Sequence, residues 1–264
     1  MIGIKNVIAI VCGGGPAPGI NSVISGITNE ATRHGWDVLG IYDGFSRLAR
    51  GEKNYVRLEP KDISHIHMAG GCILKMSRFN PTKKESDLRT VVETLTELGV
   101  THLVTIGGDD TAYSSAAVSE EARKMGRTIN VVHVPKTIDN DVWGTDMTFG
   151  FHSSVEIATN VLDCIHTTAT SHGRIFCVEI MGHKVGWLPL YAGIAGGADV
   201  ILLPEIPYDI DVVVNAIRSR TKNGKNFTIL AVAEGAISKE NAALTKKELK
   251  EKKKNGPVYP SVAY

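Results

Sequence analysis

Residues 7–21 read VIAIVCGGGPAPGIN, an apolar run that ends in a turn of glycine and proline and then enters a helix-forming segment. A short apolar run of this kind suits a strand buried on both faces of a sheet. Similar runs recur at 38–41, 102–106, 131–134, 175–180, 200–203 and 228–233, with helical spacing of apolar residues between them, clearest at 88–98 and 155–165. Alternating strands and helices predict an α/β fold with mainly parallel sheets.

The composition narrows the classes of partner. The chain has 264 residues, enough for one large α/β domain or two smaller ones. With 29 basic and 28 acidic residues the net charge is +1, so we expect neither nucleic acid nor a membrane as a partner, and any anion must be bound by a local site. No stretch approaches the roughly 18 apolar residues of a membrane span.

The cysteines and the first residues bear on the compartment. Four cysteines lie far apart without a CxxC pair, and three of them have apolar neighbours. This pattern predicts buried thiols in a reducing compartment. Residues 1–5 lack the features of a signal peptide, so we expect a cytoplasmic protein.

In parallel α/β sheets, ligands bind beyond the carboxyl ends of the strands, so the turns after the apolar runs are the candidate sites. The first turn, residues 12–19, places Gly14 and Gly15 between a strand and a helix. Glycines let backbone amides approach an anion, and the helix N-terminus adds positive charge. The turn therefore predicts a phosphate site, although such a turn can also serve only to pack a helix on its sheet.

The second turn, Ile106-Gly107-Gly108-Asp109-Asp110-Thr111, also follows a strand and opens a helix. Acidic residues at a phosphate site would repel the ligand unless one of them holds Mg²⁺. Asp109 is the candidate metal ligand. Asp110 and Thr111 alternatively cap the helix, which is compatible with the metal role.

The third turn, Pro135-Lys136-Thr137-Ile138-Asp139-Asn140-Asp141, carries a lysine and two acids behind a strand. A hydroxyl that attacks phosphorus needs a base, and Asp139 suits that role. Lys136 places a cation where charge develops on the phosphate, Thr137 offers a hydroxyl to a phosphoryl oxygen, and Asp141 could orient the metal or Lys136.

Further candidates lie later in the chain and between the first two turns. Arg174 suits a bidentate grip on a phosphate, Met181 and Gly182 could line a sugar, and Glu234 could accept hydrogen bonds from sugar hydroxyls. Arg78 is a cation without an obvious partner in its local sequence, for which a surface salt bridge is the alternative role.

These motifs in this order resemble the phosphofructokinase family, kinases of the 1-hydroxyl of fructose 6-phosphate. The resemblance runs from about Val7 to Glu234 through GGPAPGIN, GGDDT, PKTIDND and AGIAGGAD. It implies two similar three-layer α/β/α domains with the active site in the cleft between them. We expect domains at 1–145, for the phosphoryl donor, and 146–236, for the sugar phosphate, followed by a charged connector at 237–264.

The resemblance also implies roles for single residues. By matching positions, Asp139 is the base, Asp109 the Mg²⁺ ligand, and Thr137 and Asp141 their neighbours. Donor contacts fall on Gly14, Gly15, Arg78, Gly108, Asp110 and Thr111, and sugar contacts on Met181, Gly182, His183 and Glu234. Arg174 resembles the arginine that a neighbouring subunit lends to the sugar phosphate, which implies a homodimer or homotetramer.

Two features depart from the family pattern. His183 stands where arginine is usual, exchanging a permanent cation for one mostly neutral at pH 7. Either Lys184 compensates for the missing charge or the acceptor differs. The family also continues beyond the position of Tyr264 with further contacts to the sugar phosphate, so we expect the native chain to be longer.

Asp110 and Lys136 lead to an expectation about the phosphoryl donor. ATP-dependent relatives typically have glycine at the position of Asp110, and a carboxylate there would fill space and repel the α-phosphate of a nucleotide. Pyrophosphate ends before reaching it, and Lys136 supplies a cation for that shorter donor. The sequence therefore predicts a pyrophosphate-dependent 6-phosphofructokinase, with ATP as the less favoured donor. The alternatives are an ATP-dependent enzyme, a kinase of another sugar phosphate, and a non-catalytic subunit that binds sugar phosphate.

Overall fold

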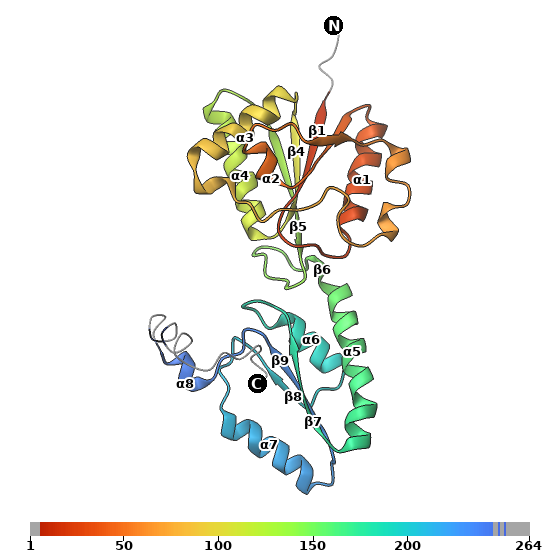
Figure 1. Ribbon diagram of the computed structural model, residues 1–264, viewed down its shortest axis with the longest axis vertical. Coiled ribbons are helices and arrows are strands. Elements are labelled where there is room, and N and C mark those ends of the chain that lie inside the picture. Colours follow the sequence, from red (N-terminus) through yellow and green to blue (C-terminus); the bar gives the residue numbers. More distant parts are fainter. Residues whose placement is uncertain (1–5, 245–247, 249–250, 252–264) are drawn as a thin grey trace. The chain divides into compact units, whose positions relative to one another are not determined.

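The computed structural model describes residues 6–244, 248 and 251, and the chain divides into two compact units. Unit 1 comprises residues 1–137 and 141–150, and unit 2 comprises 138–140 and 151–264. The α/β fold with mainly parallel sheets is confirmed (Figure 1). Most of the expected connector at 237–264 lies outside the described residues.

The sheet of unit 1 has the strand order β3-β2-β1-β4-β5-β6, and all its pairings are parallel except that of β3 with β2. Its strands are β1 (Val7–Cys12), β2 (Asp37–Ile41), β3 (Tyr55–Arg57), β4 (His102–Gly107), β5 (Asn130–Thr137) and β6 (Phe149–Gly150). Its helices are α1 (Ile20–Arg33), α2 (Phe45–Leu48), α3 (Glu85–Glu97) and α4 (Asp109–Lys124), with short 3₁₀ turns η1 (Pro60–Asp62), η2 (Ile66–Met68) and η3 (Pro81–Lys83).

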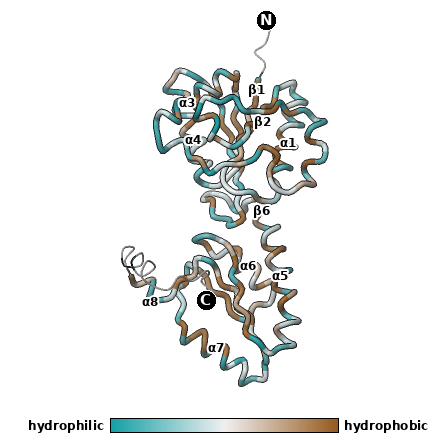
Figure 2. Tube along the Cα trace, viewed as in Figure 1, coloured by the Kyte–Doolittle hydropathy of each residue, from teal (hydrophilic) through white to brown (hydrophobic). Residues whose placement is uncertain are grey.

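Side chains of β1 alternate between the two covered faces of this sheet. Ala9 and Val11 pack with residues of α2, α3 and α4 on one face. Ile8 and Ile10 pack with α1 and with the segment 58–74 on the other. Because both faces are covered, β1 is apolar at every position, which explains the continuous run in the sequence. The hydropathy colouring shows the same apolar strands inside each unit (Figure 2).

Unit 2 contains a smaller parallel sheet with the order β7-β9-β8. Its elements are α5 (Phe151–His172), β7 (Ile175–Ile180), α6 (Trp187–Ala195), β8 (Val200–Leu202), α7 (Ile210–Lys222), β9 (Thr228–Ala233) and α8 (Lys239–Ala242). The central strand β9 is buried throughout, with Ile229 and Ala231 in the core beneath α5 and α6, and Leu230 and Val232 packed with Val213 of α7.

The structure corrects the expectation of buried thiols. Cys12 is buried at the end of β1 and Cys72 is half-buried, but Cys164 and Cys177 are exposed. Cys177 belongs to β7, where residues 175, 177 and 179 are exposed while 176, 178 and 180 pack in the core, so one face of this strand is uncovered. Apolar neighbours in sequence were therefore a poor guide to burial at these two positions.

In the part of the chain that the structure describes, every helix is too short or too polar to pass through a lipid bilayer.

Candidate active site

The glycine turn after β1 is held by its own backbone N–H groups. Gly13 donates to the carbonyl of Ile106 at 2.9 Å, and Gly14 donates to the carbonyl of Ser77 at 3.0 Å. Gly14 has a φ of 84°, a left-handed conformation that favours glycine. These two N–H groups fix the path of the loop, so the N–H groups that could face an anion belong to the residues after Gly14.

Thr111, in the first turn of α4, fills the space beneath this loop. A Cβ added to Gly13 or to Gly107 would overlap the side chain of Thr111. Thr111 itself is buried. The two glycines therefore admit one threonine side chain, which joins the carboxyl ends of β1 and β4 to the start of α4.

Two cations lie against the glycine loop. Lys136 is 6% exposed, and its Nζ donates to the carbonyl of Gly15 at 2.7 Å. Arg78 is exposed, and its Nη2 would lie 3.7 Å from a Cβ on Gly15. Cations at these positions compensate the charge of a polyphosphate, so this arrangement suits the donor end of a phosphoryl transfer.

Asp109 and Asp110 form the first turn of α4 beside Gly108, and both are exposed. Oδ1 of Asp109 accepts a hydrogen bond from the Asp110 N–H at 2.8 Å. Among the described residues no three His, Cys, Asp or Glu side chains gather as a metal site. Mg²⁺ nonetheless commonly uses one or two carboxylates together with waters and substrate phosphates, and the exposed carboxylate of Asp109 beside the loop fits that mode.

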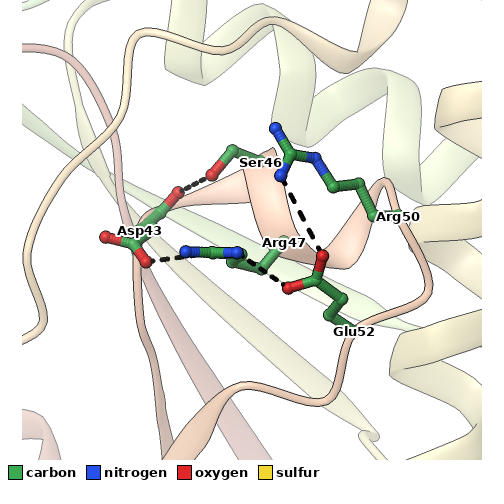
Figure 3. Close-up of polar contacts among 5 residues, drawn as sticks. All are labelled: Asp43, Ser46, Arg47, Arg50 and Glu52. Atoms are coloured by element: carbon green, nitrogen blue, oxygen red, sulfur yellow. Dashed lines mark hydrogen bonds and ion pairs between the residues drawn. The ribbon is translucent and has the colours of Figure 1, made fainter.

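A polar network fixes the turn after β2, next to the end of β1 (Figure 3). Arg47 donates to Asp43 at 3.3 Å and to Glu52 at 3.0 Å, and the Ser46 hydroxyl donates to the Asp43 carbonyl at 2.7 Å. Arg50 lies 4.0 Å from Glu52. The carboxylates of Asp43 and then Glu52 raise the pKa of Arg47.

The network holds a turn that the sequence analysis missed. Asp43 and Gly44 both have positive φ, and a Cβ on Gly44 would lie 2.9 Å from the carbonyl of Cys12 and 3.3 Å from Ser77. The Asp-Gly pair is a recognisable turn signal, so this support of the loop could have been found in the sequence. The hydrogen bond from the Gly14 N–H to the Ser77 carbonyl has no comparable signal in the sequence.

The third predicted turn follows β5. Thr137 ends the strand, is buried, and accepts a hydrogen bond at its carbonyl from the Thr148 hydroxyl at 2.9 Å. Asp139 is half-buried and is grouped with unit 2, as Ile138 packs in the core of that unit. Asp141 is exposed and belongs to unit 1.

In unit 2, Glu234 follows β9 and fastens the turn after β7. Its Oε1 accepts the N–H of Gly182 at 3.0 Å and also the N–H of His183. Gly182 and His183 both have positive φ, so the turn depends on this carboxylate and on glycine at the first position. These three of the predicted sugar-side residues therefore lie together, with Glu234 directed at the backbone of the turn.

Met181 lies beside this turn and is 59% exposed. Arg174, immediately before β7, is also exposed and makes no ion pair among the residues described. The structure thus gathers Gly14, Gly15, Arg78, Lys136 and Thr111 in unit 1, and Gly182, His183 and Glu234 in unit 2. Two surface pockets of about 480 and 470 Å³ contain none of the predicted site residues.

Comparisons with known proteins agree with these motifs. A family model described as Phosphofructokinase matches residues 7–259. The chain is 44% identical over 248 residues to a protein of Spirochaeta thermophila named ATP-dependent 6-phosphofructokinase, covering 90% of this chain and 66% of that protein. It is 44% identical to ATP-dependent 6-phosphofructokinase 3 of Bacteroides thetaiotaomicron, covering 88% of this chain and 68% of the other. The chain thus spans about two thirds of these relatives.

Two solved structures share the fold. The T-state phosphofructokinase of Pichia pastoris has a TM-score of 0.84 and 32% identity, covering 94% of this chain and 28% of that one. The pyrophosphate-dependent phosphofructokinase of Marinobacter aquaeolei has a TM-score of 0.80 over 88% of this chain and 61% of that one, and its 23% identity bears on the fold alone.

The predicted preference for pyrophosphate over ATP is wrong. The relatives at 41–44% identity are named ATP-dependent 6-phosphofructokinase. The structure gives a physical reason, because the Asp110 side chain is exposed and has solvent to turn into. Lys136 is bonded to the glycine loop, so its presence does not require a short donor. Asp110 and Lys136 therefore do not select pyrophosphate.

The packing of Thr111 predicts a rescue. Gly13→Ala should destabilise unit 1 by about 1–3 kcal/mol, because the added methyl overlaps Thr111. Adding Thr111→Ala removes the two overlapping terminal atoms, so the double variant should be more stable than the sum of the single effects predicts. Chemical denaturation measures the coupling. Gly26→Ala in α1, where a Cβ meets nothing within 4 Å, is the control and should not destabilise. Additive single effects would contradict the packing.

The Glu234 contacts predict a local change in amide exchange. Glu234→Ala should speed exchange at Gly182 and His183 by roughly 10–100-fold, since each loses a hydrogen bond to a charged acceptor. Glu205→Ala is the matched control, because the Glu205 carboxylate accepts the N–H of Gly186 at 2.8 Å in the same turn region. Hydrogen exchange followed by NMR separates the two. Equal effects of both variants at Gly182 would refute a specific role for Glu234.

Proposed function

The chain belongs to the phosphofructokinase family, and from this premise we propose that it transfers the terminal phosphoryl group of ATP to the 1-hydroxyl of fructose 6-phosphate. The products are ADP and fructose 1,6-bisphosphate. The observation that carries the proposal is 44% identity, over 90% of this chain, to a relative named ATP-dependent 6-phosphofructokinase. The chain matches about two thirds of the length of that relative. We therefore propose the activity for a protein of the relative's full length.

The donor side of the proposal rests on unit 1. Phosphoryl transfer spreads negative charge over the oxygens of the moving group, and catalysis consists mainly of positioning and charge compensation. Lys136 and Arg78 supply positive charge at the glycine loop, and the N-terminal end of α4 adds its partial positive charge. Gly14, Gly15, Gly108 and Thr111 shape the seat for the phosphates, and the exposed Asp110 lies at its edge.

The chemical step needs a base for the attacking hydroxyl. Asp139 accepts the proton of the 1-hydroxyl while the oxygen of that hydroxyl bonds to phosphorus. The bond between this phosphorus and the leaving oxygen of ADP breaks in the same step. Thr137 donates to a phosphoryl oxygen, and Asp141 orients Lys136 or the metal. Mg²⁺ held by Asp109 would neutralise the phosphate charge between donor and base.

The acceptor side rests on unit 2. Met181 and Gly182 line the sugar, and Glu234 both fixes their turn and faces the sugar hydroxyls. Arg174, an exposed cation, binds the 6-phosphate of the sugar held in the active site of a neighbouring subunit. The active protein is therefore a homodimer or homotetramer. His183, exposed where arginine is usual in the family, favours a second candidate, a kinase of another sugar phosphate.

The donor assignment is tested by steady-state kinetics with fructose 6-phosphate and Mg²⁺. The purified protein should form fructose 1,6-bisphosphate faster with ATP than with pyrophosphate. Faster turnover with pyrophosphate would overturn the donor, and turnover only with another sugar phosphate would overturn the acceptor. Binding of fructose 6-phosphate in a calorimeter without turnover would indicate a non-catalytic subunit.

Asp139→Asn tests the base. Removal of the proton acceptor should lower kcat by roughly 10²–10⁴-fold with smaller changes in KM. Asp211→Asn makes the same change at an exposed position in the first turn of α7 and should keep full activity. An Asp139→Asn protein with unchanged kcat would remove Asp139 from the chemical step.

A further inference from the structure

A chain of polar groups connects the sheet of unit 1 with the first turn of α4. Nδ1 of His133 in β5 lies 2.9 Å from Oγ1 of Thr105 in β4, its direct neighbour across the two strands. Oγ1 of Thr105 lies 2.6 Å from Oγ of Ser115 in α4. The Ser115 hydroxyl donates to the carbonyl of Thr111 at 2.6 Å. Thr105 and Ser115 are 0% and 1% exposed, so their hydroxyls must find partners inside the protein.

Counting protons gives this chain a direction. Ser115 has one hydroxyl proton and gives it to the Thr111 carbonyl, which can only accept. The contact between Thr105 and Ser115 must then use the proton of Thr105. Since Thr105 has no second proton, the proton in its contact with His133 has to come from Nδ1 of the ring.

The second ring nitrogen is consistent with this assignment. Nε2 of His133 is buried, and no group among the described residues meets it with hydrogen-bond geometry; the Gly107 carbonyl acts on the ring only strongly enough to oppose part of the fall in its pKa. A lone pair at that place costs less than a buried N–H without an acceptor. Burial lowers the pKa of His133. The Gly107 carbonyl raises this pKa and the Lys136 cation lowers it, each by less than burial does. The ring is therefore neutral at pH 7 and carries one proton.

We propose that His133 is a positioning residue of the phosphoryl-donor site, which donates from Nδ1 and thereby directs the Thr105 and Ser115 hydroxyls toward the first turn of α4. The chain of hydrogen bonds ends on Thr111, the residue that packs beneath Gly13 and Gly107. If the ring proton were on Nε2, Thr105 would donate to His133, Ser115 to Thr105, and the Thr111 carbonyl would lose the hydroxyl. The kinetic part of this proposal rests on the proposed use of ATP.

The tautomer is measured directly by NMR of ¹⁵N-labelled protein at pH 7.5. Long-range ¹H–¹⁵N spectra should show Nδ1 of His133 protonated and Nε2 unprotonated, with the signal assigned by its loss in His133→Gln. In Thr105→Val, which removes the acceptor, the Nδ1–H form should lose its preference over the Nε2–H form. A protonated Nε2 in the unaltered protein would overturn the proposal, whether or not the protein uses ATP.

Two substitutions at Thr105 separate hydrogen bonding from packing. Thr105→Val keeps the volume and removes the hydroxyl, so KM for ATP should rise by roughly three- to tenfold, while KM for fructose 6-phosphate stays within about twofold. Thr105→Ser keeps the hydroxyl and should stay within about twofold of the unaltered protein for both. If Thr105→Ser were the more damaged of the two, the role of Thr105 would be packing and the proposal would fail.

Thr101 provides the matched control. Its Oγ1 lies 2.9 Å from Nδ1 of His102, the first residue of the same strand β4, and also bonds the N–H and the carbonyl of Val7 at 3.0 and 3.1 Å. Thr101→Val therefore breaks a contact between threonine and histidine together with two contacts to β1. This variant should leave KM for ATP within about twofold, because Thr101 does not lead to α4. An equal rise of KM for ATP in Thr101→Val and Thr105→Val would mean general loosening of the sheet and would overturn the proposal. If no variant uses ATP at all, the proposed function fails and the tautomer still decides the role of His133.

Discussion

The proposed donor site of unit 1 depends on the packing of one side chain, that of Thr111, where Gly13 and Gly107 have no Cβ. This contact joins the ends of two neighbouring parallel strands to the start of the helix that follows the second of them. Because β1 and β4 are paired directly, the loops after them emerge side by side. The glycines are thus required first by packing between segments, and the open approach to a phosphate is a consequence of the same missing side chains.

Electrostatics then acts on a loop whose shape is already fixed. Backbone hydrogen bonds of Gly13 and Gly14 and the turn at Asp43 and Gly44 define its path, and Lys136 reaches the carbonyl of Gly15 from β5. Unit 2 follows a similar logic with opposite charge, because the Glu234 carboxylate holds the N–H groups of a glycine-containing turn. In each unit a charged residue at the end of one strand fastens a turn that begins at another strand of the same sheet.

Much of the fold was predictable from the sequence because the strands are buried on both faces and therefore form continuous apolar runs. The short strands β3 and β6 were not predicted, since three and two residues give too little pattern to detect. The glycine loop, Lys136 and the acids of α4 could be predicted to share one site because they follow strands. The contacts made by Ser77 and the directed chain from His133 could not, because both depend on segments that are distant in sequence and meet only in the folded unit.

Asp110 and Thr111 show why the donor could not be read from residue type. Both lie in the first turn of α4 after the same strand, yet Thr111 is buried against two glycines and Asp110 is exposed. A side chain excludes a ligand only where its neighbours hold it in the ligand's space, and an exposed aspartate has several rotamers to choose from. Thr111 meets that condition through packing, so its volume defines the floor of the site. Asp110 does not, and an argument from the volume of its side chain therefore fails.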